Sequence, residues 1–559
     1  MNECRFLEYD KNNCSVYESI TKNEKIFGGT FWYKQNSTCI GEKLDKINEI
    51  FKHFSENNID LNAKQLCFIK PFIFTNFTSV INLNLLNNSL SSISTNTFYG
   101  LSNLENLELS WNKIESIENG TFESLSKLRT LNLSYNLIAD LSSNMLCGLN
   151  NLERLNLYSN KVSQIHKDFF NGLVNLSYIN LDYNSISSLD EQTFGFLSKL
   201  IYLNLGNNEL ESIEAGTFYG LDKIEEIHLH NNKIKSIDSM AFNFLISLRV
   251  LKLAYNQLVN ISELTFKNLT FLEVLDLRFN NIEYLNPELF NDLINLRYLY
   301  LGSNMIKEID SKLFNNLPNL YILNLDANKI IFINETTFKE LKKLILLYIR
   351  YNLLTMLHEN MFDGLVNLKE LYLANNQISF VHKNSFNGMV NLRFLSLSTN
   401  RIAHLDSEIF SKISELHSLN LGLNQLKSID LCYLKNLDTL DLNTNLFTNF
   451  TTNLTTIRNL YLSYNPLRYL NYSFFESNGT VPSLEMLQIN NCQLELIDVN
   501  AFKDYENLQD LRIYGNPFKY LNDSIFDGLD KLTRVDINRN VESITNLKTM
   551  NQQIIFIFY

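Results

Sequence analysis

The chain has 559 residues, a formal net charge of -12 and a sequence pI near 5.3. Its lysines and arginines form no basic stripe of the kind that phosphates require, so we do not expect a nucleic-acid partner. No run of about 18 apolar residues occurs, so we expect no membrane-spanning helix in this chain.

The amino-terminal segment, residues 1–55, precedes the regular part of the sequence. It lacks the charged start and apolar run of an export signal, which at face value indicates a cytoplasmic chain. The cysteines favour the opposite, because an even number near one end is typical of disulfides that hold a terminal cap. We predict two disulfides, with four reduced thiols as the alternative, among Cys4, Cys14, Cys39 and Cys67.

A repeat occupies residues 56–540. Leu104, Leu128 and Leu152 are spaced 24 residues apart, and each opens a phrase such as LENLELSWNKI or LRTLNLSYNLI. We number the positions of each repeat from this leucine; positions 1, 4, 6, 11, 14, 19 and 22 are apolar in nearly every unit. One unit cannot bury that many apolar residues alone, so the units must stack into a continuous core. The first unit, from Glu56, is degenerate, with Lys64 in place of the usual asparagine.

This pattern resembles the 24-residue form of the leucine-rich repeat family, as in the ectodomains of Toll-like receptors, chaoptin, Slit and the leucine-rich-repeat hormone receptors. The resemblance implies an α/β-type solenoid, a horseshoe of about twenty coils. A parallel β-sheet would line its concave face, with irregular or short helical turns on the convex face. We expect the phenylalanines at position 19 to form a packed spine, the asparagines at position 9 to bond neighbouring backbone, and Cys492 to be a buried thiol.

The spacing becomes irregular over residues 416–483. The intervals between opening residues are 21 from Leu416 to Leu437, 20 to Ile457 and 27 to Leu484. We expect a change of curvature there. The tail, residues 541–559, ends in QQIIFIFY, which either covers the last coil or indicates an incomplete chain, because an uncapped solenoid exposes its core.

Positions 3, 5, 7 and 8 alternate away from the core and map the concave surface. The early coils carry a polar ladder at position 5 that includes Asn132 and Asn156, whereas the middle coils are aromatic over roughly 30 Å. Exposed tyrosine, phenylalanine and arginine are enriched in protein interfaces, although aromatic pairs on adjacent strands also stabilise a sheet. We predict a ligand-binding patch whose substitution leaves the melting temperature nearly unchanged: Tyr255, Phe279, Tyr298, Tyr300, Tyr348, Arg350, Tyr351, Tyr372 and Phe394.

Histidines suggest two weaker sites. His228 and His230 alternate onto the concave face and could share a metal ion, but solvated polar residues are the simpler reading. On the outer side of the arc, His358 and His382 share position 15 of consecutive coils, and His404 follows; mutual repulsion on protonation would weaken stability or binding near pH 5 to 6. Glycosylation sequons barely exceed chance; the candidates are Asn119, Asn260, Asn334, Asn471 and Asn522.

The chain contains no phosphate-binding loop, zinc-protease helix motif or nucleophile elbow, so we expect neither enzyme activity nor a cofactor. By the resemblance, it is a recognition module that binds a protein, or a glycan, through its concave face as a cell-surface receptor or adhesion ectodomain. The alternatives are a structural or adhesive matrix protein that self-associates, as a homodimer for example, and an intracellular scaffold.

Overall fold

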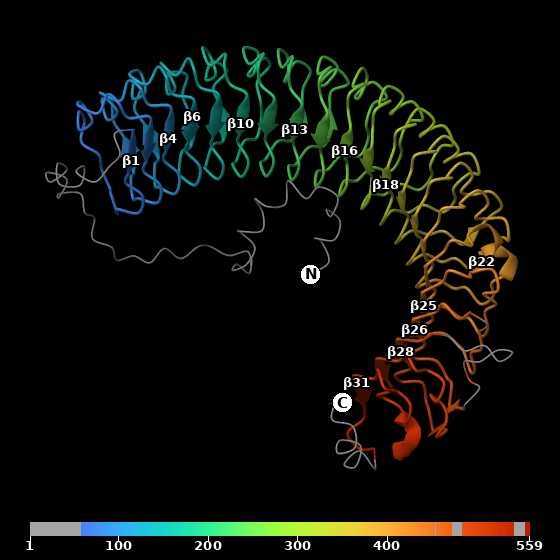
Figure 1. Ribbon diagram of the computed structural model, residues 1–559. Helices are drawn as coiled ribbons and strands as arrows, with labels where there is room; N and C mark the ends of the chain where they lie inside the picture. Colours follow the sequence, from blue (N-terminus) through green and yellow to red (C-terminus); the bar gives the residue numbers. More distant parts are fainter. Residues whose placement is uncertain (1–56, 453, 472–473, 475–482, 542–553) are drawn as a thin grey trace.

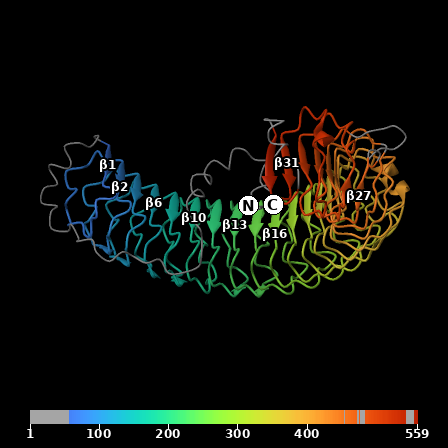
Figure 2. The same cartoon turned by 90° about the horizontal axis from the view of Figure 1, so that it is seen from below.

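The structure, a computed structural model, describes residues 57–452, 454–471, 474, 483–541 and 554–559. The chain winds into a curved solenoid in which each repeat makes one coil, and the strands line the inner side of the arc (Figure 1). The horseshoe architecture predicted from the repeat is confirmed. Viewed from below, the coils around β27 (Tyr469–Leu470) turn out of the row formed by the amino-terminal coils (Figure 2).

The concave face is a 22-stranded sheet in which all pairings are parallel. Each regular strand covers positions 3 to 5 of its coil, and Leu107 at position 4 lies opposite Leu131 of the next coil. In order across the sheet the strands are β1 (Asn58–Asp60), β2 (Asn82–Asn84), β4 (Asn106–Glu108), β6 (Thr130–Asn132), β8 (Arg154–Asn156), β10 (Tyr178–Asn180), β11 (Tyr202–Asn204), β13 (Glu226–His228), β15 (Val250–Lys252), β16 (Val274–Asp276), β17 (Tyr298–Tyr300), β18 (Ile322–Asn324), β19 (Leu346–Tyr348), β21 (Glu370–Tyr372), β23 (Phe394–Ser396), β24 (Ser418–Asn420), β25 (Thr439–Asp441), β26 (Asn459–Tyr461), β28 (Met486–Gln488), β30 (Asp510–Arg512), β31 (Arg534–Ile537) and β32 (Ile555–Phe558).

The convex face is built from turns and very short elements, as predicted. The 3₁₀ helices within the described residues are η5 (Ser407–Lys412) and η6 (Asp523–Phe526). No helix in the described part of the chain is both long and apolar enough to cross a bilayer. Pairs of two-residue strands link some neighbouring coils: β3 (Ser92–Ile93) with β5 (Ser116–Ile117), β7 (Asp140–Leu141) with β9 (Gln164–Ile165), β12 (Ser212–Ile213) with β14 (Ser236–Ile237), β20 (Met356–Leu357) with β22 (Phe380–Val381), and β27 with β29 (Leu496–Ile497).

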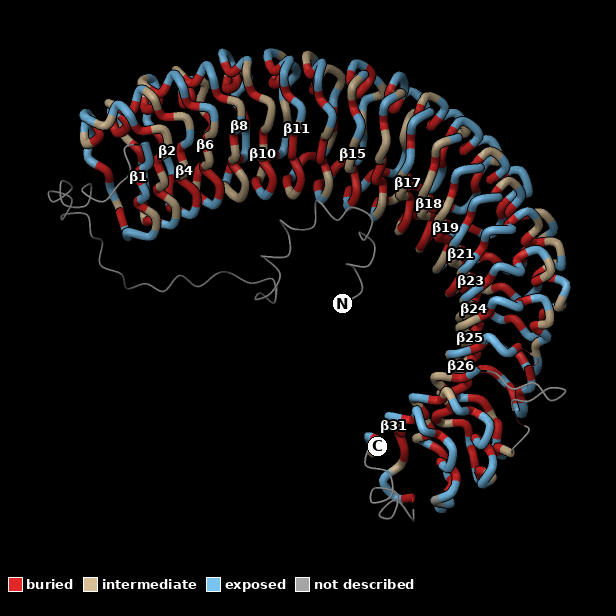
Figure 3. Tube along the Cα trace, in the orientation of Figure 1, coloured by how far each residue is buried: buried red, intermediate tan, exposed pale blue. Residues whose placement is uncertain are grey.

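The core runs the length of the arc between the two faces, and buried residues recur in every coil (Figure 3). The predicted phenylalanine spine is present: the rings of Phe338 and Phe362 lie 6.2 Å apart, nearly parallel and fully buried. The asparagine ladder is present too. Asn112 donates from Nδ2 to the carbonyls of Leu85 and Leu109, at 3.0 Å each, and its Oδ1 accepts from the amide of Leu90. These bonds satisfy backbone groups that the turns would otherwise leave unpaired in the core.

Cys492 replaces the asparagine in one coil and is fully buried, as predicted. Its Sγ donates weakly to the carbonyls of Leu462 and Asn490, and burial raises the pKa of the thiol to about 12. The side chain therefore fills the asparagine site as a protonated group.

The irregular coils leave the concave sheet unbroken. Strand residues pair across all three intervals, with Ser418 opposite Thr439, Thr439 opposite Asn459 and Asn459 opposite Met486. Since the register on the concave side is constant, the difference in coil length is taken up outside the sheet. These coils lie where the arc turns back toward its own centre (Figure 1).

Near the carboxyl end, one further strand adds to the concave sheet. Strand β32 adds to β31 in parallel register, and the ring of Phe556 lies 6.2 Å from that of Phe526. The last residues of QQIIFIFY therefore cover the final coil, which was one of the two predicted alternatives.

The predicted amino-terminal cap lies outside the described residues. Cys4, Cys14 and Cys39 belong to that segment. Cys67 is disulfide-bonded, and it lies in the first coil of the array. The pairing scheme among the four cysteines stays a prediction.

Candidate ligand-binding surface

Position 8 of the repeat, three residues beyond the end of the strand, has a left-handed backbone in most coils. The φ angles are 57° at Tyr255, 53° at Phe279 and 55° at Tyr351. Such angles are uncommon for residues other than glycine, and here the turn out of the strand imposes them on whatever residue the coil carries. Position 8 therefore places large aromatic side chains along the edge of the concave sheet without any need for burial.

Three members of the predicted patch occupy this position and are exposed; we call Tyr255, Phe279 and Tyr351 the rim residues. Tyr351 is 58% exposed, Tyr255 51% and Phe279 42%. The rings of Tyr255 and Phe279 stack with centroids 4.1 Å apart and planes 8° apart. The stacked pair is rigid yet open to solvent, a combination that allows a partner to bury area at a small cost in side-chain entropy.

Five other residues form a packed group that we call the concave cluster: Asp326, Tyr348, Arg350, Tyr372 and Phe394. The rings of Tyr348 and Tyr372 stack 4.7 Å apart, and the ring of Phe394 lies 4.8 Å from that of Tyr372. Tyr348 is only 4% exposed. The expectation that Tyr348 offers a contact surface is therefore wrong, because the residues of the neighbouring strands cover its ring.

Arg350 is also engaged within the protein. Its Nε and Nη2 donate to Oδ2 of Asp326 at 2.9 and 2.6 Å, and its backbone amide donates to Oδ1 at 2.6 Å. The guanidinium carbon lies 5.4 Å from the ring centroids of both Tyr348 and Tyr372. Arg350 thus joins two coils, and its charge is neutralised by a largely buried carboxylate.

The remaining tyrosines of the patch are half-buried. Tyr300 lies beneath Arg278, whose guanidinium carbon is 4.9 Å from the ring centroid. Nε of Arg278 donates to Oδ1 of Asp276 at 3.0 Å, and Nη2 donates to Oδ2 at 2.7 Å. Tyr298 lies near Arg297, at 5.6 Å. Burial raises the pKa of Tyr300 to about 12 and raises the pKa of Tyr372 as well, so these hydroxyls stay neutral donors near neutral pH.

Two histidines, His228 on strand β13 and His230 just after it, pack against the sheet. His228 is buried, with its Nε2 3.3 Å from Oε2 of Glu226 and its Nδ1 3.4 Å from the hydroxyl of Tyr202. The rings of His228 and His230 are 6.0 Å apart. Burial lowers the pKa of both imidazoles. Among the described residues, no group of three or more histidine, cysteine or carboxylate side chains could hold a metal ion.

The outer histidines contact different partners. Nε2 of His358 meets the carbonyl of Ile333, and its ring stacks 5.0 Å from that of Phe332. Nδ1 of His382 accepts from the amide of Asn384, while His404 is exposed. The suggested effect of their protonation stays a prediction.

The candidate glycosylation sites are accessible: Asn119, Asn260, Asn334 and Asn522 are exposed, and Asn471 is half-buried. The Oδ1 atoms of Asn334 and Asn522 accept from the amides of Thr336 and Ser524. Whether any site carries a glycan stays a prediction.

A second aromatic row lies on the amino-terminal coils and was not predicted. Trp111 stacks on Tyr135 at 4.1 Å, Tyr135 meets Tyr158 at 5.0 Å, and Tyr158 meets Tyr183 at 5.3 Å. Trp111 and Tyr183 are each 53% exposed. The missed signal was positions 7 and 8, because only position 5 was considered in these coils.

Comparison with known proteins identifies the same repeat over most of the chain. The family model described as "Leucine rich repeat" matches overlapping segments that run from residue 57 to 402, and again residues 482–541. The unmatched interval holds the irregular coils. A search of curated proteins found no match to this sequence.

Several solved structures have a similar fold. The Drosophila Toll–Spatzle complex has a TM-score of 0.64 and 21% identity, over 88% of this chain and 79% of that chain. YopM from Yersinia enterocolitica has a TM-score of 0.60 and 19% identity, over 88% of this chain and 94% of that chain. The plant peptide hormone receptor RGFR1 in complex with RGF2 has a TM-score of 0.52 and 22% identity, over 90% of this chain and 95% of that chain. At these identities the likeness concerns the fold.

Proposed function

We propose a function from the premise that this chain belongs to the leucine-rich repeat family: it is a non-enzymatic recognition module that binds a protein through the concave side of its middle coils. The rim residues supply the principal contacts, and the half-buried Tyr298 and Tyr300 supply a floor beside them. The observation that most supports this proposal is the exposed, stacked pair of Tyr255 and Phe279.

The chemistry of this surface favours a protein ligand. Aromatic rings and neutral hydroxyls dominate it, and both arginines at its centre, Arg278 and Arg350, are neutralised by aspartates. A phosphate-rich ligand would find little free positive charge there. A glycan is the second candidate ligand, since hydroxyls and aromatic edges also suit sugars. Toll with Spatzle and RGFR1 with RGF2 are complexes of this fold with other ligands, which supports the use of the fold for recognition.

The proposed setting is extracellular, as a receptor or adhesion ectodomain. The disulfide-bonded state of Cys67 and the exposure of four candidate sequons support it. An intracellular scaffold is the alternative. The occupancy of Asn334 and Asn522 by glycans in protein from its own cells, measured by mass spectrometry, separates the two.

The binding test uses a matched pair of variants. Immobilised protein should retain a specific partner from extracts of its own cells, and Tyr255→Ser with Phe279→Ser should reduce the retained amount at least about tenfold. Tyr464→Ser is the control, because Tyr464 occupies position 8 with the same backbone conformation and exposure but lies in a distant coil. Equal retention by the double variant and the control would reject the proposed surface.

A further inference from the structure

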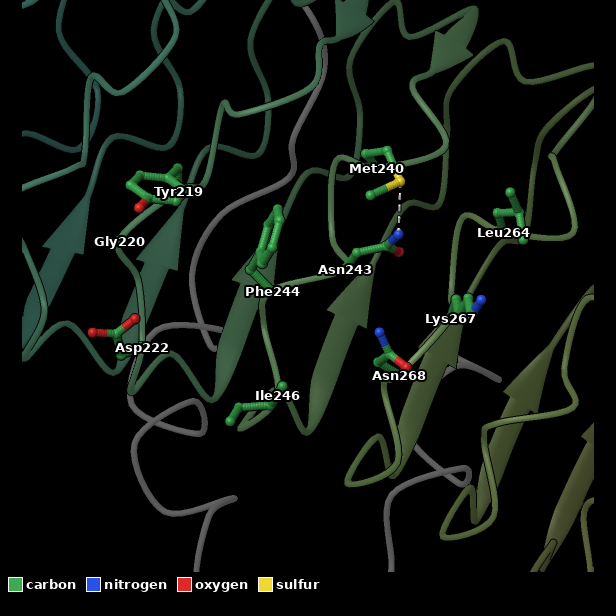
Figure 4. Close-up of a pocket in the computed structure, with 10 residues that line it drawn as sticks. All are labelled: Tyr219, Gly220, Asp222, Met240, Asn243, Phe244, Ile246, Leu264, Lys267 and Asn268. Atoms are coloured by element: carbon green, nitrogen blue, oxygen red, sulfur yellow. Dashed lines mark hydrogen bonds between the residues drawn. The ribbon is translucent and has the colours of Figure 1, made fainter.

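One flank of the solenoid carries large apolar side chains that the coils do not bury. On the side where the chain returns from the convex face to the strands, positions 17 to 23 of three adjacent coils present Tyr219, Met240, Phe244, Ile246 and Leu264 (Figure 4). Each is between 40% and 60% exposed. They surround a depression of about 790 Å³. We call this surface the flank patch.

Phe244 occupies position 21 of the repeat, as does the exposed Phe196 two coils earlier. Position 21 is often glycine with a left-handed backbone, as at Gly172 and Gly220. Phe244 is not among the residues with positive φ, so this coil has a different local backbone that accommodates a side chain. Its ring packs edge-to-face on Tyr219 at 6.1 Å and is 56% exposed. Coil stability does not require such a ring, and an exposed apolar cluster of this kind is typical of an association surface.

Polar groups are distributed unevenly around the flank patch. Asp222 lies at one end and Lys267 toward the other, with Phe244 and Met240 between them (Figure 4). Asn243 lines the centre, is 7% exposed, and donates from Nδ2 to Sδ of Met240 at 3.0 Å. Its Oδ1 is buried and lacks a hydrogen-bond partner within the described part of the chain.

We propose that the flank patch is a homodimer interface, so that its occupant is the same surface of a second copy. A two-fold axis near Phe244 would exchange the two ends of the patch and bring Asp222 of each copy to Lys267 of the other. In such an interface every contact occurs twice, so one opposite-charge pair gives two ion pairs at the edges of an apolar centre.

The size of the flank patch determines how strongly we expect the two copies to associate. Stable interfaces use roughly 20 to 30 residues from each side, whereas three coils supply about half as many here. The dimer should therefore be weak and concentration-dependent, with a Kd in the micromolar range. The flank is separate from the concave side, so dimerisation leaves the rim residues open.

The test uses the pairing of Asp222 in each copy with Lys267 in the other. The interface requires Asn268, which lies in the flank patch and begins the sequon Asn268-Leu-Thr, to carry no glycan. The protein is therefore produced in a host without N-glycosylation, and its mass is measured by sedimentation equilibrium. The wild type should dimerise reversibly, and Phe244→Ser should raise the Kd at least about tenfold. Asp222→Lys and Lys267→Asp should each be monomeric alone, and a mixture of the two should form a heterodimer. The doubly reversed variant should dimerise like the wild type.

Other outcomes overturn the proposal. A wild type that stays monomeric throughout the micromolar range excludes the homodimer. Dimers unaffected by Phe244→Ser place the interface elsewhere, and failure of the mixed single variants to associate rejects the two-fold arrangement. Since Phe244, Asp222 and Lys267 are all exposed, thermal unfolding of every variant should match the wild type and so exclude misfolding as a cause.

Discussion

The concave cluster and the rim residues are both aromatic and belong to the same coils, yet they have opposite environments. Tyr348 and Tyr351 are three residues apart; one is 4% exposed and the other 58%. Tyr348 lies on strand β19, where side chains of the adjacent coils cover it, whereas Tyr351 lies past the strand on a left-handed residue. Aromatic content alone therefore does not identify a binding surface in a solenoid.

The difference follows from the distance between neighbours. Equivalent residues of parallel strands are spaced about 4.8 Å apart, close to the distance between the centroids of two stacked rings, so consecutive aromatic residues at position 5 bury one another. Aromatic residues at position 8 also stack in places, but one side of the row faces solvent. We interpret the concave cluster as scaffold and the rim residues as contact surface, and four predictions follow in order of expected effect.

The largest effect is expected for Tyr348→Ala. Removing a buried aromatic ring leaves a cavity and should lower the free energy of unfolding by about 3 kcal/mol. Tyr351→Ala, in the same coil, should change it by less than about 0.5 kcal/mol. Urea unfolding followed by circular dichroism measures both. Equal destabilisation by the two substitutions would contradict the division between scaffold and surface.

Asp326→Ala should have the next largest effect. The substitution leaves the Arg350 guanidinium unpaired beside two tyrosine rings. Because the Arg350 side chain is 30% exposed, we expect the free energy of unfolding to fall by about 2 kcal/mol, which is below the range for fully buried pairs. Glu211→Ala is the control, since its ion pair with Lys235 is solvent-exposed and should not affect the unfolding midpoint. If both substitutions leave the midpoint unchanged, the cluster is not a stabilising unit.

A smaller loss is expected when the rim stack is removed. Tyr255→Ser together with Phe279→Ser eliminates one exposed ring pair, which should lower the free energy of unfolding by no more than about 1 kcal/mol. The same urea experiment tests this value. A loss as large as that of Tyr348→Ala would show that the stack belongs to the scaffold.

The smallest effect concerns His228, a buried concave residue outside the aromatic stretch. Burial lowers its pKa below the ordinary value of 6.5, against the opposing influence of Glu226, and nearby Lys252 also lowers it. The unfolded chain then binds more protons than the folded chain, so stability is lost as the pH falls through about 6.5 toward the folded pKa. His228→Gln should reduce this loss relative to the wild type in unfolding measured between pH 7.5 and 5. His230, Tyr202 and Asp182 are unchanged in that comparison, so an identical pH profile would exclude a contribution from His228.

Most of the fold could be predicted from the sequence because the repeat fixes it position by position. The buried leucines, the Phe338 to Phe362 stack, the asparagine bonds and the buried thiol of Cys492 all follow from one rule applied to each coil. The covering of the last coil by β32 could be given only as an alternative, because QQIIFIFY lies outside the repeat.

The candidate surface was less predictable. Alternation places Tyr348 and Tyr300 on the concave side but does not show how neighbouring rings cover them, and the Asp326–Arg350 pair joins residues 24 positions apart. The flank patch was missed because positions 17 to 23 were read as turns. Exposure at these sites depends on contacts between coils, which a single repeat does not contain.

The most direct test of the central claim places a photo-crosslinking amino acid at Tyr351 and, in a separate protein, at Tyr464. Both positions are exposed, at 58% and 57%, and share the same left-handed backbone. After irradiation in extracts of its own cells, the account predicts a discrete protein adduct at position 351 and none at position 464. Equal labelling at both positions, or labelling only at 464, would contradict the assignment of the rim of the middle coils as the ligand-binding surface.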